Sequence, residues 1–135
     1  MNDAPVGPGR HEARERAIEL LYEADTRSAS ADEILDALPL DPDPYAEAAF
    51  TGVSASQIRI DELIEEFSTG WSVHRMPLVD RAILRLAVWE LTDRDDVPTA
   101  VILNEAVELA KDYSTERSPA FINGVLDAVA ANVRD

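Results

Sequence analysis

The segment from Leu78 to Leu91 constrains the fold more than any other part of the chain, because apolar residues cover most of its sides. It reads Leu-Val-Asp-Arg-Ala-Ile-Leu-Arg-Leu-Ala-Val-Trp-Glu-Leu, with no proline or glycine to interrupt a helix. A helix that is apolar nearly all round is stable only when other elements surround it. We therefore expect this segment to be the central helix of the core.

The remaining segments also have helical rather than strand periodicity. Apolar residues recur at spacings of three and four, and no stretch alternates with period two for long enough to make a strand. The pattern predicts helices that begin near Arg10, Ser30, Tyr45, Val97 and Pro119, in addition to the central one.

Local signals refine these boundaries. Ser30 and Glu33 have the spacing of a capping box, and Ser118 precedes a proline that suits the first turn of a helix. The long helical stretch that ends at Phe67 is loosened midway, near Gly52 and 54–56. We expect an all-α protein of about seven helices: a flexible tail over residues 1–9, then one helical domain over 10–135.

The charge is strongly acidic but unevenly distributed. The 135 residues hold 27 acidic and 12 basic side chains, for a formal net charge of −15. Nucleic-acid-binding proteins usually have a basic footprint, so the total alone argues against such a partner. Residues 32–73 hold ten acidic side chains and one basic, a net −9. Because the excess is concentrated there, the total does not exclude a basic site elsewhere.

The sequence offers little catalytic or metal chemistry. It has no cysteine, no Gly-rich phosphate loop and no Gly-x-Ser-x-Gly motif, and its two histidines are His11 and His74. We therefore expect no enzyme activity, no cofactor and no metal. No apolar run approaches the ~18 residues of a membrane span, and the first nine residues do not resemble a secretory signal. We expect a soluble cytoplasmic protein without membrane contact.

Three motifs, in order, resemble those of the NusB family of bacterial transcription antitermination factors. Val79–Leu91 resembles the family's central helix, and Asp96–Lys111 resembles its VP-x-x-V-x-I-NEA-x-ELAK run. Phe121–Asp127 is similar to its FVNGVLD signature. The family's arginine-rich opening helix is matched by Arg10, Ala13, Arg14, Ala17, Leu21 and Tyr22. The resemblance runs from Arg10 to Val133 and is weakest over 25–70.

This resemblance implies a fold and a function. The fold would have two antiparallel helical subdomains, about 10–70 and 71–135, packed as one body. The function would be that of a non-enzymatic adaptor in the bacterial cytoplasm. It would pair with the small-subunit ribosomal protein NusE and bind boxA RNA. With the other Nus factors it would help RNA polymerase to read through terminators, notably in ribosomal RNA operons.

The first candidate RNA-binding residues are Arg10, His11 and Arg14. Arg10 and Arg14 share one face in the first turns of a helix, where the helix dipole favours phosphate. Arginine also pairs with phosphate in a planar fork. The alternative is that these arginines only pair with Glu15 and Glu19. The family resemblance favours RNA contact.

The second set of candidates surrounds the turn after residue 113. In the family this region lies near bound RNA, and unpaired bases commonly stack on aromatic rings. Tyr113 and Phe121 would supply the rings; the alternative is that both are core residues, which for Tyr113 is an equally good interpretation. Many relatives have an acidic residue in place of Arg117 and a lysine in place of Ala120, so we hypothesise that Arg117 replaces that lysine. Asn123 is expected either to contact RNA or to cap a helix.

The family pattern points to Tyr22 and Asp80 as contacts for the ribosomal protein. Ribosomal proteins are generally basic, so the acidic surface would attract one over long range. Trp71 and Trp89 are expected in the core.

Three residues are assigned structural roles. Arg85 lies on the apolar central segment, and a buried unpaired charge is costly, so we expect Glu105 or Glu90 as its partner. Gly124 is expected to allow two helices to approach closely.

Two other interpretations stay open. The chain could be a helical protein–protein interaction module, or a homodimer that hides its RNA face. NusB-like domains also occur fused to RNA cytosine methyltransferases, but such a chain would have several hundred more residues and a Gly-rich cofactor loop.

Overall fold

The computed structural model describes residues 8–134, which form seven α-helices and one short 3-10 helix, with no strand among them. The prediction of an all-α fold with about seven helices is confirmed. The predicted tail lies outside the described residues as far as residue 7, and the first helix begins at Pro8. The elements are α1 (Pro8–Arg27), α2 (Ala31–Asp36), α3 (Pro44–Ala55), α4 (Gln57–Phe67), η1 (Val73–Arg75), α5 (Leu78–Asp93), α6 (Thr99–Tyr113) and α7 (Ser118–Val133).

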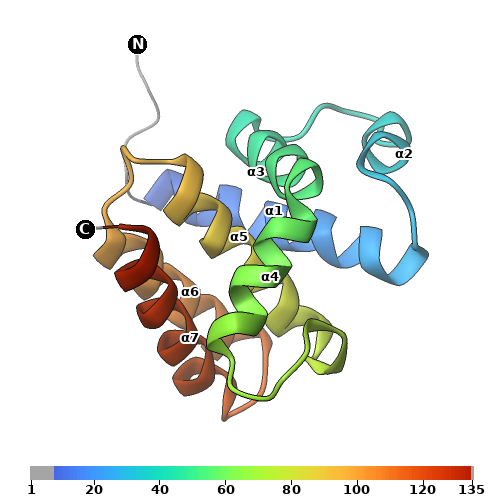
Figure 1. Ribbon diagram of the computed structural model, residues 1–135. Coiled ribbons are helices and arrows are strands. Elements are labelled where there is room, and N and C mark those ends of the chain that lie inside the picture. The colour runs from blue at the N-terminus through green and yellow to red at the C-terminus, as the bar shows by residue number, and fades with distance from the viewer. Residues whose placement is uncertain (1–7, 135) are drawn as a thin grey trace.

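Helix α5 is the centre of the molecule, as predicted. It packs against α1, α3 and α4 on one side and against α6 and α7 on the other (Figure 1). Every residue from Ala82 to Leu91 is buried, including the charged Arg85 and Glu90. Because α5 has neighbours all round, these two charges must find their partners inside the protein.

All the other α-helices except α2 pack directly against α5. Helices α6 and α7 are joined by a short turn and lie side by side, whereas the short α2 sits at the edge of the molecule against α1 and α3 (Figure 1). Within residues 8–134 no helix is both long and apolar enough to cross a bilayer.

The predicted helix signals are found in the structure. The Ser30 hydroxyl accepts from the Glu33 backbone N–H at 3.1 Å, and the Ser30 N–H donates to the Glu33 carboxylate at 2.9 Å, which completes the capping box. The Asp43 side chain caps α3 just ahead of Pro44. The helical stretch up to Phe67 is divided into α3 and α4 at Ser56.

The close helix contact predicted at Gly124 is found at Gly52 instead. A Cβ atom at Gly52 would lie 2.1 Å from Nε1 of the buried Trp89, so α3 and α5 approach closely only because this residue lacks a side chain. Gly124 is exposed, and a Cβ atom there would have nothing within 4 Å. The expectation for Gly124 was therefore wrong.

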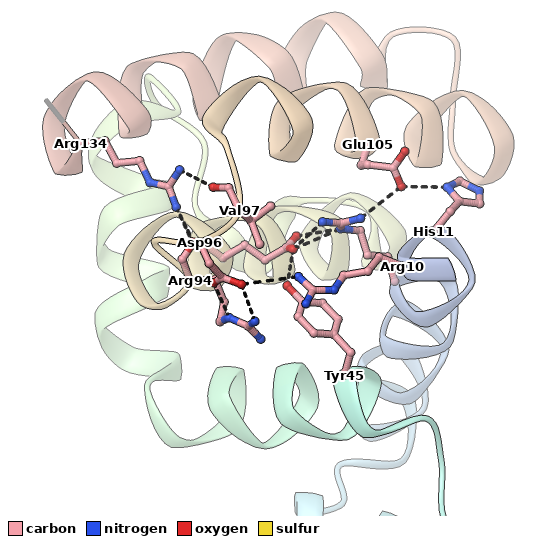
Figure 2. Close-up of polar contacts among 10 residues, drawn as sticks. Arg10, His11, Tyr45, Arg94, Asp96, Val97, Glu105 and Arg134 are labelled. Carbon is pink, nitrogen blue, oxygen red and sulfur yellow. Dashed lines mark hydrogen bonds and ion pairs between the residues drawn. The ribbon is translucent and has the colours of Figure 1, made fainter. Parts of the chain in front are cut away.

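Arg134 fixes the end of α7 to the connection between α5 and α6. Its guanidinium donates to the Thr99 hydroxyl and to four backbone carbonyls, those of Glu90, Leu91, Arg94 and Val97. The donation to Val97, at 2.7 Å, can be followed in Figure 2. One side chain thus supplies donors to several carbonyls at the end of α5 and in the following loop, where the regular helical hydrogen bonds end.

The two glycines should respond in opposite directions to the same substitution. Gly52→Ala should lower the free energy of unfolding by roughly 1–3 kcal/mol, because the methyl group overlaps the Trp89 ring. Gly124→Ala should raise it by about 0.5–1 kcal/mol, because alanine favours a helix and meets no atom there. Urea unfolding of both variants measures the difference; equal effects would contradict the assignment.

Candidate nucleic-acid interface

The arginine at the heart of the predicted RNA-binding turn, Arg14, is buried. Its side chain is 1% exposed and pairs with the equally buried Glu90 of α5. Nε of Arg14 lies 3.1 Å from each Glu90 oxygen, and Nη2 lies 2.8 Å from Oε2. The Tyr45 hydroxyl donates to the same carboxylate at 2.5 Å. Arg14, Tyr45 and Glu90 therefore join α1, α3 and α5 in one internal network.

Arg10 lies one helical turn earlier and is also largely enclosed. Its guanidinium carbon lies 4.2 Å from the centroid of the Tyr45 ring, and Nη1 lies 3.9 Å from Asp96. Arg94 also approaches this ring, at 4.8 Å, while donating twice to Asp96 at 2.9 and 2.8 Å (Figure 2). Burial, followed by the nearby Glu90 carboxylate, raises the pKa of Tyr45, which keeps the phenol neutral.

These contacts correct the sequence-based assignment of two residues. Arg10 and Arg14 face other helices, so they position α1 instead of offering their guanidinium groups to a phosphate. Their partners are not Glu15 and Glu19, the alternative considered from sequence, but groups from distant segments.

His11 is the one member of this trio that reaches the surface. Its Nδ1 lies 2.9 Å from Oε1 of Glu105, and its Nε2 lies 3.6 Å from Glu15. The same Glu105 oxygen accepts from Arg14 at 3.4 Å, so Glu105 connects the exposed imidazole to the buried pair. The hydrogen bond to Glu105 raises the pKa of His11 above 6.5.

Arg85 has carboxylate partners, as predicted, but not the predicted ones. It donates twice to Asp61 of α4, at 2.8 Å each, and to Asp25 of α1 at 3.1 Å. Glu90 is five positions further along α5 and therefore points to another side of that helix. Glu90 and Glu105 form ion pairs with Arg14 instead.

Asp80 is inside the protein, not on a partner-facing surface. Its carboxylate accepts from the hydroxyls of Ser114 and Ser118, the latter at 2.9 Å. These serines begin and end the turn between α6 and α7, so Asp80 fixes that turn to the start of α5. This geometry assigns Asp80 a structural role in place of the expected partner contact.

The turn fixed by Asp80 borders an apolar surface groove of about 310 Å³. Arg117 and Phe121 line it, together with Trp71, Met76, Pro77 and Thr115. The expectation of a core position for Trp71 was wrong: it is 51% exposed, and its ring centroid lies 6.3 Å from that of Phe121. Its place in the non-helical break after α4 was the sequence signal for exposure.

Tyr113 belongs to a second groove, of about 370 Å³, which it shares with Tyr22, Ile18 and Val79. Glu15, Glu19 and Glu23 line the same groove. Both tyrosines are exposed, and the Tyr113 hydroxyl donates to Glu15 at 2.6 Å, which raises the pKa of Tyr113. The predicted RNA-binding residues are thus divided: Tyr113 lies beside the expected partner contact Tyr22, away from Phe121.

Two further observations complete the surface. Asn123 is exposed on α7, two residues beyond Phe121. Among residues 8–134 no group of three or more histidine or acidic side chains could hold a metal ion. The described residues thus form seven α-helices, with α5 buried at the centre, and surface grooves that include those at Phe121 and at Tyr22.

The comparisons with known proteins agree with this fold. The model of the NusB family matches residues 11–131. The solved structure of T. maritima NusB is 33% identical, with a TM-score of 0.84 over 99% of this chain and 96% of that one. Aquifex aeolicus NusB is 31% identical, with a TM-score of 0.73 over 90% and 87%. A structure of the antitermination factors NusB and NusE in complex with dsRNA matches at 27% identity, with a TM-score of 0.74 over 91% and 96%. The chain belongs to the NusB family.

Replacing one charge of the buried ion pair should destabilise the protein more than replacing both. Arg14→Met removes the cation that pairs with Glu90, and Glu90→Gln leaves Arg14 only the longer contact to Glu105, so each should lower the free energy of unfolding by roughly 3–5 kcal/mol. The stability loss of the double variant should be smaller, by at least about 1 kcal/mol, than the sum of the losses of the two single variants. Urea unfolding of all four proteins measures this coupling; additive losses would contradict a direct interaction.

The His11–Glu105 contact should make stability depend on pH. Because the pKa of His11 is raised by folding, its contribution is complete below pH 6.5 and is lost as the pH rises through the folded-state value. The free-energy difference between the wild type and His11→Gln should therefore shrink from pH 5.5 towards about pH 8.5. In a Glu105→Gln background this pH dependence should largely vanish; a persistent dependence would assign it to Glu15 or Asp112 instead.

Proposed function

We propose that this chain is an antitermination factor that pairs with NusE and binds boxA RNA, as a non-enzymatic adaptor in the bacterial cytoplasm. Membership of the NusB family carries the proposal. The similar structure that holds NusB, NusE and dsRNA together supports both partners. The adaptor would join RNA polymerase and the other Nus factors in ribosomal RNA operons. This role needs no cofactor and no chemical step.

The RNA face is proposed to be the groove at the start of α7. Phe121 offers a ring on which an unpaired base can stack, and Arg117 is exposed beside it at the helix N-terminus. A guanidinium group at this end of a helix complements a phosphate in charge. Asn123, exposed on α7, and His11, at the start of α1, are further proposed contacts; the hydrogen bond to Glu105 raises the pKa of His11, which favours its cationic form.

The partner face is proposed to be the groove around Tyr22 and Tyr113. Its base is apolar and its rim carries Glu15, Glu19 and Glu23. An aliphatic lysine or arginine stem could cover the rings while the charged end meets a carboxylate. This chemistry fits a basic ribosomal protein.

The two proposed faces explain how an acidic protein can bind RNA. With a net charge of −15 the chain repels a polyanion over long range. A basic partner bound through the acidic groove lowers that repulsion and adds phosphate contacts of its own. We therefore expect RNA affinity to depend on NusE.

A binding titration with labelled boxA RNA, with and without NusE and over a range of salt, tests this function. Arg117→Asp should weaken RNA binding of the pair roughly tenfold and lower the salt slope by about 1, because one phosphate contact is lost. Tyr22→Asp should weaken NusE binding. Arg59→Asp is the matched control, since it makes the same charge change at an exposed site on α4.

Each result bears on a separate claim. Unchanged affinity in Arg117→Asp would remove Arg117 from the RNA face. Absence of RNA binding with and without NusE would overturn the adaptor function and favour the helical interaction module. Light scattering of the protein alone would then report a homodimer.

A further inference from the structure

The exposed indole of Trp71 is the surface feature that the contacts described above leave without a role. About half of the Trp71 surface is exposed, and together with Phe121 it forms an apolar patch of the kind that marks interaction sites. It lies in the connection between α4 and α5, which passes the start of α7 (Figure 1). There it meets Phe121 at an interplanar angle of 59°.

Trp71 and Phe121 together form a ridge between two hollows. The first is the groove of about 310 Å³ that contains Arg117. The second, of about 460 Å³, is lined by the same two rings and by Phe67, Ser68, Thr69, Ala120, Gly124 and Val125. The two hollows thus share one aromatic wall.

Gly124 keeps the second hollow open. A Cβ atom there would meet nothing within 4 Å, so the absence of a side chain at this position is not required by packing. Glycine costs a helix interior about 1 kcal/mol relative to alanine. Its presence in the lining of a hollow is consistent with space kept for a ligand.

The charge around the ridge suits an anionic ligand better than the charge elsewhere on this chain does. No acidic residue occurs from Phe67 to Val79 or from Arg117 to Leu126, the two segments that supply most of both linings. Asp80, at the edge of the first hollow, already accepts hydrogen bonds from two serines. Arg117 and Arg75 are exposed on these segments.

We propose that the Trp71–Phe121 ridge inserts between the bases of two adjacent unpaired nucleotides of the bound RNA. One base would occupy the Arg117 groove and the other the Gly124 hollow. Flat rings take any base by stacking, and the basic side chains meet the connecting phosphate. This inference rests on the proposed RNA-binding function and adds Trp71 and the second hollow to it.

Fluorescence and affinity of the protein–NusE pair with boxA RNA test the ridge. RNA should quench the emission of Trp71 in the wild type, whereas Trp71→Phe, which retains only the buried Trp89, should show no quenching. Trp71→Ala should bind roughly tenfold more weakly, and Trp71→Phe should recover most of that loss. Gly124→Leu should also bind roughly tenfold more weakly, because its side chain fills the second hollow.

Controls separate this inference from the adaptor function and from misfolding. Ile58→Ala removes another exposed apolar side chain, away from both hollows, and should bind RNA like the wild type. Circular dichroism should show Gly124→Leu folded and at least as stable as the wild type. Tight RNA binding by Trp71→Ala without quenching in the wild type would overturn the ridge and leave the adaptor function intact. No RNA binding by the wild-type pair would overturn both.

Discussion

The buried ion pair between Arg14 and Glu90 is the interaction on which the arrangement of the other elements depends. Two charges in an interior are tolerated only when geometry and hydrogen bonding are complete, and here Tyr45 supplies the additional donor. The pair fixes α1 in both register and rotation against α5. Tyr22, further along α1, lines the groove that has Glu15, Glu19 and Glu23 at its rim. The orientation of this groove therefore depends on how the core holds α1.

A second buried arginine joins α5 to other helices on another side of α5. Arg85 holds Asp61 of α4 and Asp25 of α1, so α5 is joined through charge to helices from both ends of the first half of the chain. Arg134 and Asp80 tie the α6–α7 hairpin to the two ends of α5. The Asp80 contact holds the turn that carries Arg117.

The sequence predicted the features that depend on residues close together in the chain. Periodicity located the helices, and a capping box and the all-round apolar segment predicted the start of α2 and the central position of α5. Partners across long separations had no such signal: Arg85 meets Asp61 and Asp25, and Glu90 meets Arg14, because of how the helices rotate as they pack. Glycines at 52 and 124 are alike in sequence, and only the facing Trp89 distinguishes them. Trp71 was misjudged because its residue type favoured the core, whereas its place in the non-helical break after α4 indicated exposure.

Acidic side chains have different roles in different parts of the fold. Many carboxylates are used internally, where Glu90, Asp61 and Asp80 each satisfy a buried or half-buried donor. Others gather on the groove around Tyr22, while the segments beside Trp71 and Phe121 carry none. A uniformly acidic surface would repel both a polyanion and any complex that contained one. The acidic rim around Tyr22 can attract a basic protein, whereas the segments around Trp71 and Phe121 combine aromatic rings with the exposed cations Arg75 and Arg117, which suit an RNA. Such separation is what an adaptor between a protein and an RNA requires.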